Sequence, residues 1–230
     1  MILLLLSCLI TMEVEKEKTL ISLENKSLPS CNQKYNVGEE SSVRIQFDMD
    51  EDIRGWGSGN YLKIGKYKFV LTAAHVVDTG DVSILDKEGK IPAKVIYHNT
   101  LRDVAILLPE SELSIKARAI KINDKPDILG QIVNYTGYPA NIGKSTYRGF
   151  VSNSDSEKLI IQSFALPGSS GSVVFDKRGR VIGVVSAVSV NQTPLSPFPE
   201  LIETIVIVER VDFLDKAFLK EVFMNAKDKG

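Results

Sequence analysis

Cysteine, histidine and tryptophan are scarce in this chain of 230 residues. The two cysteines are Cys8 and Cys31, the two histidines are His75 and His98, and tryptophan occurs once. Because both cysteines precede residue 40, no disulfide can cross-link the rest of the chain, and its fold has to be stabilised by packing. Two histidines and two N-terminal cysteines make no credible zinc site, and we expect neither a metal nor a cofactor.

An excess of charge of either sign is also missing. The chain has 28 Lys and Arg against 29 Asp and Glu, a formal net charge of −1 and a pI near 6.2. No cluster of Lys and Arg alternates with aromatic residues in the way that a nucleic-acid surface requires. Nucleic acid is therefore not expected as a partner.

The apolar run at residues 1–10 is too short to span a bilayer as a helix. It is close to the apolar part of a signal peptide, although the usual positive n-region is missing. Leu5-Leu6-Ser7-Cys8 resembles a bacterial lipobox, in which Cys8 would carry a lipid and attach the protein to a membrane. Three interpretations stay open: an exported protein of the cell envelope or medium, a lipoprotein, and a cytoplasmic protein with an apolar extension.

Short apolar runs bounded by turn residues dominate the sequence after residue 40. Val43, Ile45 and Phe47 alternate with polar residues, which is the period of a half-buried strand. Short, closely spaced strands of this kind favour barrels and an all-β fold. We predict strands in the ranges 43–47, 61–64, 67–71, 82–85, 93–98, 103–108, 132–135, 159–164, 173–175, 181–188 and 204–208.

The segment Gly168-Ser169-Ser170-Gly171 contains the pattern Gly-x-Ser-Gly, which is typical of a tight turn whose backbone amides face a developing oxyanion. Alone, this pattern is weak evidence. Upstream, however, His75 follows the apolar run 70–74 and Asp103 precedes another at 104–107. A serine nucleophile needs a base, and the base needs an acid partner, so the order His, Asp, Ser predicts nucleophilic catalysis.

Four further segments make the pattern specific. They are Gly57-Ser58-Gly59, Gly137-Tyr138-Pro139, the run from Arg148 to Ser152 (RGFVS), and Val181 to Ala187 (VIGVVSA). In this order, and together with His75, Asp103 and Ser170, they resemble the trypsin-like serine proteases of chymotrypsin fold. The likeness is to the bacterial branch of glutamyl endopeptidases and HtrA/Deg proteases, and it runs from about Ser42 to Phe223.

The resemblance implies an all-β fold of two six-stranded antiparallel β-barrels of chymotrypsin type with a C-terminal helix. It divides the chain into a signal-like segment and linker at 1–40 and a protease domain at 41–230, with the boundary between the barrels near 110–130 and no PDZ domain. It also implies a serine endopeptidase that cuts proteins or peptides through an acyl-enzyme. His75, Asp103 and Ser170 would form the catalytic triad, and the amides of Gly168 and Ser170 the oxyanion hole.

By the same register, Phe164 lies at the base of the substrate pocket, and Ser186, Ala187 and Val188 form its wall. No charged residue lines this pocket, so we expect cleavage after an apolar, fairly small residue. His98 is not accompanied by motifs like those around His75, and we expect it to be an exposed residue at the end of a strand.

The C-terminal segment shows the period of a helix. Asp212 is a suitable N-cap, and Leu214, Phe218 and Val222 recur every four residues. We expect this helix to pack on the second barrel.

Two alternatives to a cellular endopeptidase remain. One is a protease-fold binding protein without turnover, because an intact triad does not guarantee an assembled oxyanion hole. The other is a phage or viral processing peptidase of the same fold.

Overall fold

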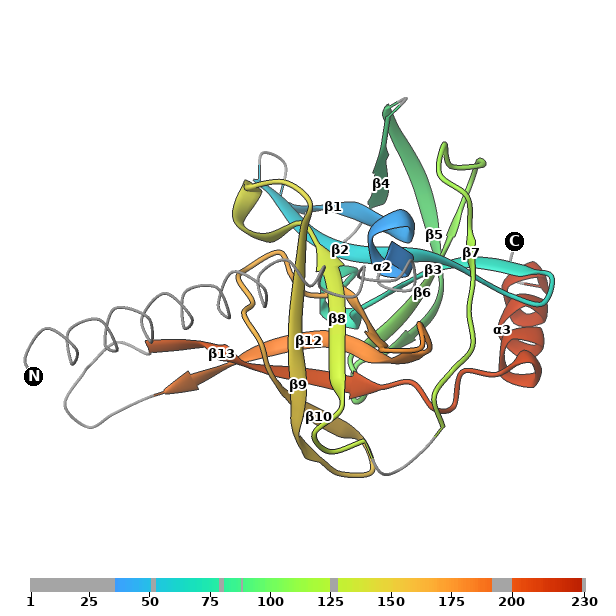
Figure 1. The fold of residues 1–230 in the computed structure, drawn as a ribbon. Helices are drawn as coiled ribbons and strands as arrows, with labels where there is room; N and C mark the ends of the chain where they lie inside the picture. The colour runs from blue at the N-terminus through green and yellow to red at the C-terminus, as the bar shows by residue number, and fades with distance from the viewer. Residues whose placement is uncertain are drawn as a thin grey trace, which may run out of the picture. The chain divides into compact units, whose positions relative to one another are not determined.

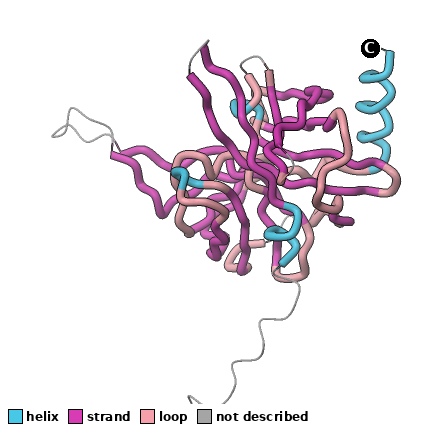
Figure 2. The backbone as a smooth tube through the Cα atoms, turned by 90° about the horizontal axis from the view of Figure 1, so that it is seen from above, coloured by secondary structure: helices cyan, strands magenta, loops and turns pink. Residues whose placement is uncertain are grey.

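Strands make up most of the computed structural model (Figure 1), which describes residues 36–50, 53–78, 81–87, 89–124, 128–191 and 200–228. Figure 2 shows the same predominance of strands from above. The first seven are β1 (Ser42–Asp50), β2 (Ile53–Ile64), β3 (Tyr67–Thr72), β4 (Val82–Asp86), β5 (Gly89–Asn99), β6 (Val104–Pro109) and β7 (Arg118–Ala119). The others are β8 (Ile132–Gly137), β9 (Ser145–Ser154), β10 (Lys158–Gln162), β11 (Val173–Asp176), β12 (Val181–Asn191) and β13 (Glu200–Arg210). The helical elements are α2 (Asn36–Ser41), α3 (Lys216–Asp228) and two 3₁₀ turns, η2 (Ala74–Val76) and η3 (Pro139–Asn141).

The first barrel has the strand order β1-β4-β5-β6-β3-β2 and is closed by antiparallel pairing of β1 with β2. β7 adds a short parallel contact to β2 outside this ring. Alternate apolar side chains of these strands point inward, as the period of two predicts, and they form one buried cluster that includes Ile45, Leu62, Phe69 and Ile106.

The second barrel is a closed ring in the order β10-β13-β12-β11-β8-β9. Its core includes the fully buried Val133, Tyr135, Leu159 and Ile161. The fold predicted from the sequence, two six-stranded antiparallel barrels followed by a C-terminal helix, is confirmed.

The strand β11 ties the two barrels together, because its side chains alternate between two cores. Val173 and Phe175 belong to the first buried cluster, whereas Val174 lies in the second. The side chain of Asn60 on β2 adds a polar link, since its Oδ1 accepts a hydrogen bond of 3.0 Å from the amide of Val173. The segment that precedes β11 is therefore held firmly against the first barrel.

The C-terminal helix differs from the expectation in two respects. Its N-cap is Asp215, whose Oδ1 accepts a hydrogen bond of 2.8 Å from the amide of Phe218. Asp212 lies in the preceding turn, 3.8 Å from Arg102. The prediction of Asp212 as the cap was wrong because both aspartates fit the capping pattern.

The helix packs on the first barrel, not on the second as predicted. The rings of Phe218 and Tyr97 on β5 lie 5.0 Å apart at 85°, and Phe223 lies 4.9 Å from Tyr67 on β3. The helical period identified the apolar face correctly, but these aromatic partners are distant in the sequence. Neither helix within the described ranges combines the length and the apolar character that a membrane crossing needs.

Candidate active site

His75 and Asp103 are brought together by the pairing of β3 with β6. Thr72 at the end of β3 lies opposite Ala105 on β6, so the residues just beyond these strands meet at one end of the sheet. His75 lies in the turn η2 after β3, and Asp103 immediately precedes β6. Asp103 has a φ of 42°, in the left-handed region that Asp enters more readily than most residues.

The imidazole of His75 is bonded to the carboxylate of Asp103. Its Nδ1 lies 2.8 Å from Oδ2 and 3.0 Å from Oδ1, and because an ionised carboxylate only accepts, Nδ1 carries the proton. The backbone amide of His75 donates a further bond of 2.9 Å to Oδ1. The hydrogen bond to Asp103 raises the pKa of His75 above its usual value, and the nearby negative charges of Asp103 and Asp78 add to this effect.

Ser186 completes the surroundings of Asp103. A bulge in β12, where two residues oppose one on β13, turns the Ser186 hydroxyl toward the carboxylate, and it donates a bond of 2.5 Å to Oδ2. Burial by itself would raise the pKa of Asp103, but the bonds from His75 and Ser186 outweigh it and lower that pKa. Asp103 is therefore held ionised, which suits an acceptor for the Nδ1 proton.

The loop from Gly168 to Gly171 has the tight conformation that its glycines predict. Gly168 and Gly171 have φ of 94° and 86°, and a Cβ on Gly171 would lie 2.0 Å from the Ser58 carbonyl oxygen. Ser169 is buried and turned inward, where its hydroxyl accepts a bond of 3.2 Å from the Leu166 amide. Ser170 is the partly exposed serine of the pair.

Ser58 on β2 holds this loop from the first barrel. Its amide donates a bond of 2.8 Å to the Ser170 carbonyl, and its hydroxyl donates one of 2.6 Å to the Gly168 carbonyl. The same hydroxyl accepts a bond of 2.8 Å from the Tyr138 amide. The carbonyls of Gly168 and Ser170 are thereby fixed toward the first barrel.

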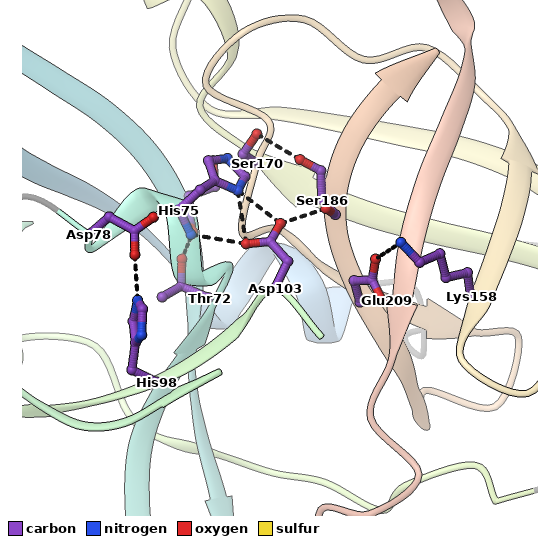
Figure 3. A network of polar contacts seen from close by, with 10 residues as sticks. Thr72, His75, Asp78, His98, Asp103, Lys158, Ser170, Ser186 and Glu209 are labelled. Atoms are coloured by element: carbon purple, nitrogen blue, oxygen red, sulfur yellow. Dashed lines mark hydrogen bonds and ion pairs between the residues drawn. The ribbon is translucent and has the colours of Figure 1, made fainter. Parts of the chain in front are cut away.

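The amides of Gly168 and Ser170 are left available by this arrangement. Within the described ranges, neither amide has a hydrogen-bond acceptor, whereas Ser169 donates to Leu166 and Gly171 to Val185. The Ser170 hydroxyl donates a bond of 3.3 Å to the Ser186 carbonyl. Ser186 thus contacts both Asp103 and Ser170, as Figure 3 shows, and connects the two barrels at this point.

The predicted pocket residues lie on two segments of the second barrel. Phe164 follows β10, is 40% exposed, and has its ring 5.9 Å from that of Tyr147 on β9. Ala187 and Val188 follow Ser186 on β12, where Ala187 is exposed and Val188 packs against the second core. Ala187 and Val188 therefore lie in the middle of β12, directly after Ser186. The role of Phe164, Ala187 and Val188 in substrate binding stays a prediction.

Two features of the site were missed in the sequence. Ser58 was noted only as part of a motif, and Ser186 only as part of a pocket wall, although their hydroxyls bond the nucleophile loop and Asp103. His98 is exposed at the end of β5, as expected, but its Nε2 lies 2.6 Å from Oδ1 of Asp78. In the described part of the chain, no group of three or more His, Cys, Asp or Glu side chains is arranged to hold a metal ion.

A two-barrel fold with a His–Asp pair on one barrel and a glycine-flanked serine on the other defines the class of trypsin-like peptidases. The family model described as "Trypsin-like peptidase domain" matches residues 57–184, which is more than half of the chain and includes His75, Asp103 and Ser170. The chain belongs to this family. The predicted resemblance to trypsin-like serine proteases of the HtrA/Deg branch is confirmed, because this family model matches and a DegP-like protease is among the relatives.

Among curated proteins, the chain is 28% identical over 152 residues to a protein of Pseudomonas putida (strain GB-1), named a probable periplasmic serine endoprotease of DegP-like type. The alignment covers 61% of this chain but only 31% of that protein, so the chain spans about a third of the relative's length.

Two solved structures share the fold. The serine endoprotease from Yersinia pestis has a TM-score of 0.63 at 23% identity and is covered to 67%, with 86% of this chain covered. The active form of the Rv3671c protease from M. tuberculosis has a TM-score of 0.62 at 20% identity, with 78% of this chain and 80% of that chain covered.

Proposed function

We propose that this protein is a serine endopeptidase in which His75, Asp103 and Ser170 form the catalytic triad. The observation that carries the proposal is the connected set of contacts from His75 Nδ1 to Asp103, from Asp103 to Ser186, and from Ser186 to the Ser170 hydroxyl. The contacts join both barrels at one point and leave His75 partly exposed, with Nε2 unprotonated in the neutral ring.

The reaction follows from these atoms. The Ser170 hydroxyl turns from the Ser186 carbonyl toward Nε2 of His75, which takes its proton as Oγ attacks the carbonyl carbon of the scissile bond. The amides of Gly168 and Ser170 donate to the oxyanion of the tetrahedral intermediate. The intermediate collapses to an acyl-enzyme when Nε2 returns the proton to the leaving amine. Water then attacks the acyl-enzyme with His75 again as the base, and the second intermediate collapses to release the carboxylic acid product and free Ser170.

Proteins or peptides are the proposed substrates. Phe164 is proposed as the base of the pocket, with Ser186, Ala187 and Val188 along its wall, and none of these residues is charged. Cleavage is therefore expected mainly after Val, Ala, Leu or similar residues. A peptide library read by mass spectrometry tests this expectation, and a preference for Arg, Lys or Glu would contradict it.

A binding protein of the same fold without turnover is the second candidate. It is favoured by one observation, that the Ser170 hydroxyl is bonded to the Ser186 carbonyl and not to His75. A nucleophile held in this orientation would not be activated by the imidazole.

A fluorophosphonate probe separates the two candidates, because it modifies only a serine that is activated as a nucleophile. Wild-type protein is expected to be labelled on Ser170, and Ser170→Ala to remain unlabelled. Ser169→Ala is the matched control, since Ser169 is buried and bonded to Leu166, and it should still be labelled. Failure to label the folded wild-type protein would favour the binding protein.

Export from the cytoplasm is proposed on two grounds: the signal-like run at residues 1–10, which lies outside the described residues, and the relative named as periplasmic. Lipidation of Cys8 is the specific form of this proposal, with residues 1–40 as leader and linker and 41–230 as the protease domain. Because one acyl chain binds membranes only marginally, a stable anchor would need further acyl groups. Mass spectrometry of the mature N-terminus tests it, and Cys8→Ser should move the protein from membrane to soluble fractions.

A further inference from the structure

The structure contains a second His–Asp contact beside the proposed triad. The Nε2–H of His98 donates to Oδ1 of Asp78 at 2.6 Å, and Figure 3 shows this pair next to His75 and Asp103. The chain has two histidines, and each of them is bonded to an aspartate.

Both contacts join the turn around η2 to the connection between β5 and β6. In each contact, one of these segments supplies the histidine and the other supplies the aspartate. His75 and Asp78 both belong to the segment of η2, where Asp78 is separated from η2 by one residue. His98 lies on β5 opposite Ala105 of β6, and Asp103 immediately precedes β6. The turn around η2 thus contributes His75 and Asp78. The connection between β5 and β6 contributes their partners, Asp103 and His98.

We call the contact between His98 and Asp78 the outer tie. Its main effect is on the geometry of the site and not on the stability of the fold. The side chains of His98 and Asp78 are 33% and 44% exposed. A solvent-exposed contact between polar side chains of this kind adds little to the free energy of unfolding, because both groups can bond water instead. A short bond between two segments nevertheless restricts how they move relative to each other, and here these segments carry the imidazole and the carboxylate of the site.

We propose that His98 and Asp78 act as positioning residues that hold the His75 imidazole against Asp103. The inference deepens the proposed function, on which it rests. Without the outer tie, η2 is attached to β6 at this end through the bonds of His75 itself and the end of β3. The His75 ring then samples more orientations, and fewer of them present Nε2 to Ser170.

Kinetics of variants test the proposal. His98→Ala and Asp78→Ala are each expected to lower kcat about tenfold, with KM changed less than about twofold, because misplacement of a catalytic group slows chemistry more than binding. His98→Gln should restore kcat to within about threefold of wild type, since its amide nitrogen has a reach similar to Nε2 and can donate to Asp78. Lys90→Gln, elsewhere on β5 and exposed, is the control and should keep wild-type kcat.

The double variant His98→Ala with Asp78→Ala distinguishes a shared role from two separate ones. If the residues act through their mutual bond, the double variant loses no more than either single variant. Additive losses, an unchanged kcat in His98→Ala, or a His98→Gln variant as slow as His98→Ala would overturn the proposal.

A spectroscopic measurement makes the test independent of turnover. His98→Ala retains His75 as its only histidine, so every imidazole resonance of that variant belongs to His75. The downfield Nδ1 proton of His75 should broaden in His98→Ala and Asp78→Ala and remain sharp in His98→Gln. If the wild type is not labelled by fluorophosphonate but this resonance responds, the proposed function fails and the positioning role stands. If labelling succeeds and neither resonance nor kcat responds, the positioning role fails alone.

Discussion

Removing the Ser58 hydroxyl is expected to affect both the stability and the chemistry of the protein. This hydroxyl is buried and serves two backbone groups, the Gly168 carbonyl at 2.6 Å and the Tyr138 amide at 2.8 Å. Leaving one buried group unsatisfied costs about 1–3 kcal/mol, so Ser58→Ala should lower the free energy of unfolding by about 2–6 kcal/mol for the two. Urea unfolding followed by the fluorescence of Trp56, the single tryptophan, measures this loss.

The effect on chemistry comes from Gly168. Once its carbonyl is released, this glycine can adopt either sign of φ and no longer fixes the direction of its amide. Loss of one oxyanion donor costs about 10² to 10³ in kcat, and Ser58→Ala should approach this range with a smaller change in KM.

Thr72→Val is the matched control for Ser58→Ala. It also removes a buried hydroxyl, which donates to the Ser58 carbonyl at 2.8 Å, but it leaves both partners of the Ser58 hydroxyl in place. It should lose stability of the same order, about 1–3 kcal/mol, and retain most of kcat. Equal losses of kcat in the two variants would refute the reasoning, because Ser58 would then act only through folding.

Three further outcomes are expected. Ser170→Ala should lower turnover by about 10⁴ to 10⁶ while Ser169→Ala keeps most of it, as measured with a labelled protein substrate, and similar losses in both would contradict the choice of nucleophile. Asp103→Asn should keep the fold, checked by circular dichroism, yet lower kcat by about 10⁴, because the amide favours the wrong tautomer of His75. The value of kcat/KM should rise with pH, because His75 must be neutral to act as the base. The midpoint of this rise should lie above about 6.5, since the pKa of His75 is raised. A midpoint below that value would count against the His75–Asp103 bond.

The barrels could be predicted because their strands carry a local signal. The alternation of Val43, Ile45 and Phe47 marks a half-buried strand without reference to the rest of the chain, and β1 occurs there. The C-terminal helix was predicted by the same kind of signal. The barrel on which it packs was not, because Tyr67 and Tyr97 are its partners and no local pattern links them to Phe218 or Phe223.

The candidate site divides in the same way. His75, Asp103 and Ser170 could be selected because each lies in a short motif, and the structure brings His75 and Asp103 into contact. The hydroxyl of Ser58 meets the Gly168 carbonyl across 110 positions of sequence, so neither its motif nor its neighbours indicate this bond. Ser186 was placed correctly on its strand, but the bulge that turns its hydroxyl toward Asp103 has no sequence signal of its own.

The two halves of the site are held by different kinds of contact, which has consequences for how each half tolerates change. On the second barrel, the loop of Ser170 is anchored by bonds to the fully buried Ser58, and bonds to a buried group are costly to break. On the first barrel, His75 is held by Asp103 and by the exposed pair of His98 and Asp78, whose loss costs little stability. Substitutions around the nucleophile loop should therefore reduce stability and activity together. Substitutions of His98 or Asp78 should reduce activity with little effect on stability. The orientation of His75 is therefore the part of this site that can vary while the fold is kept.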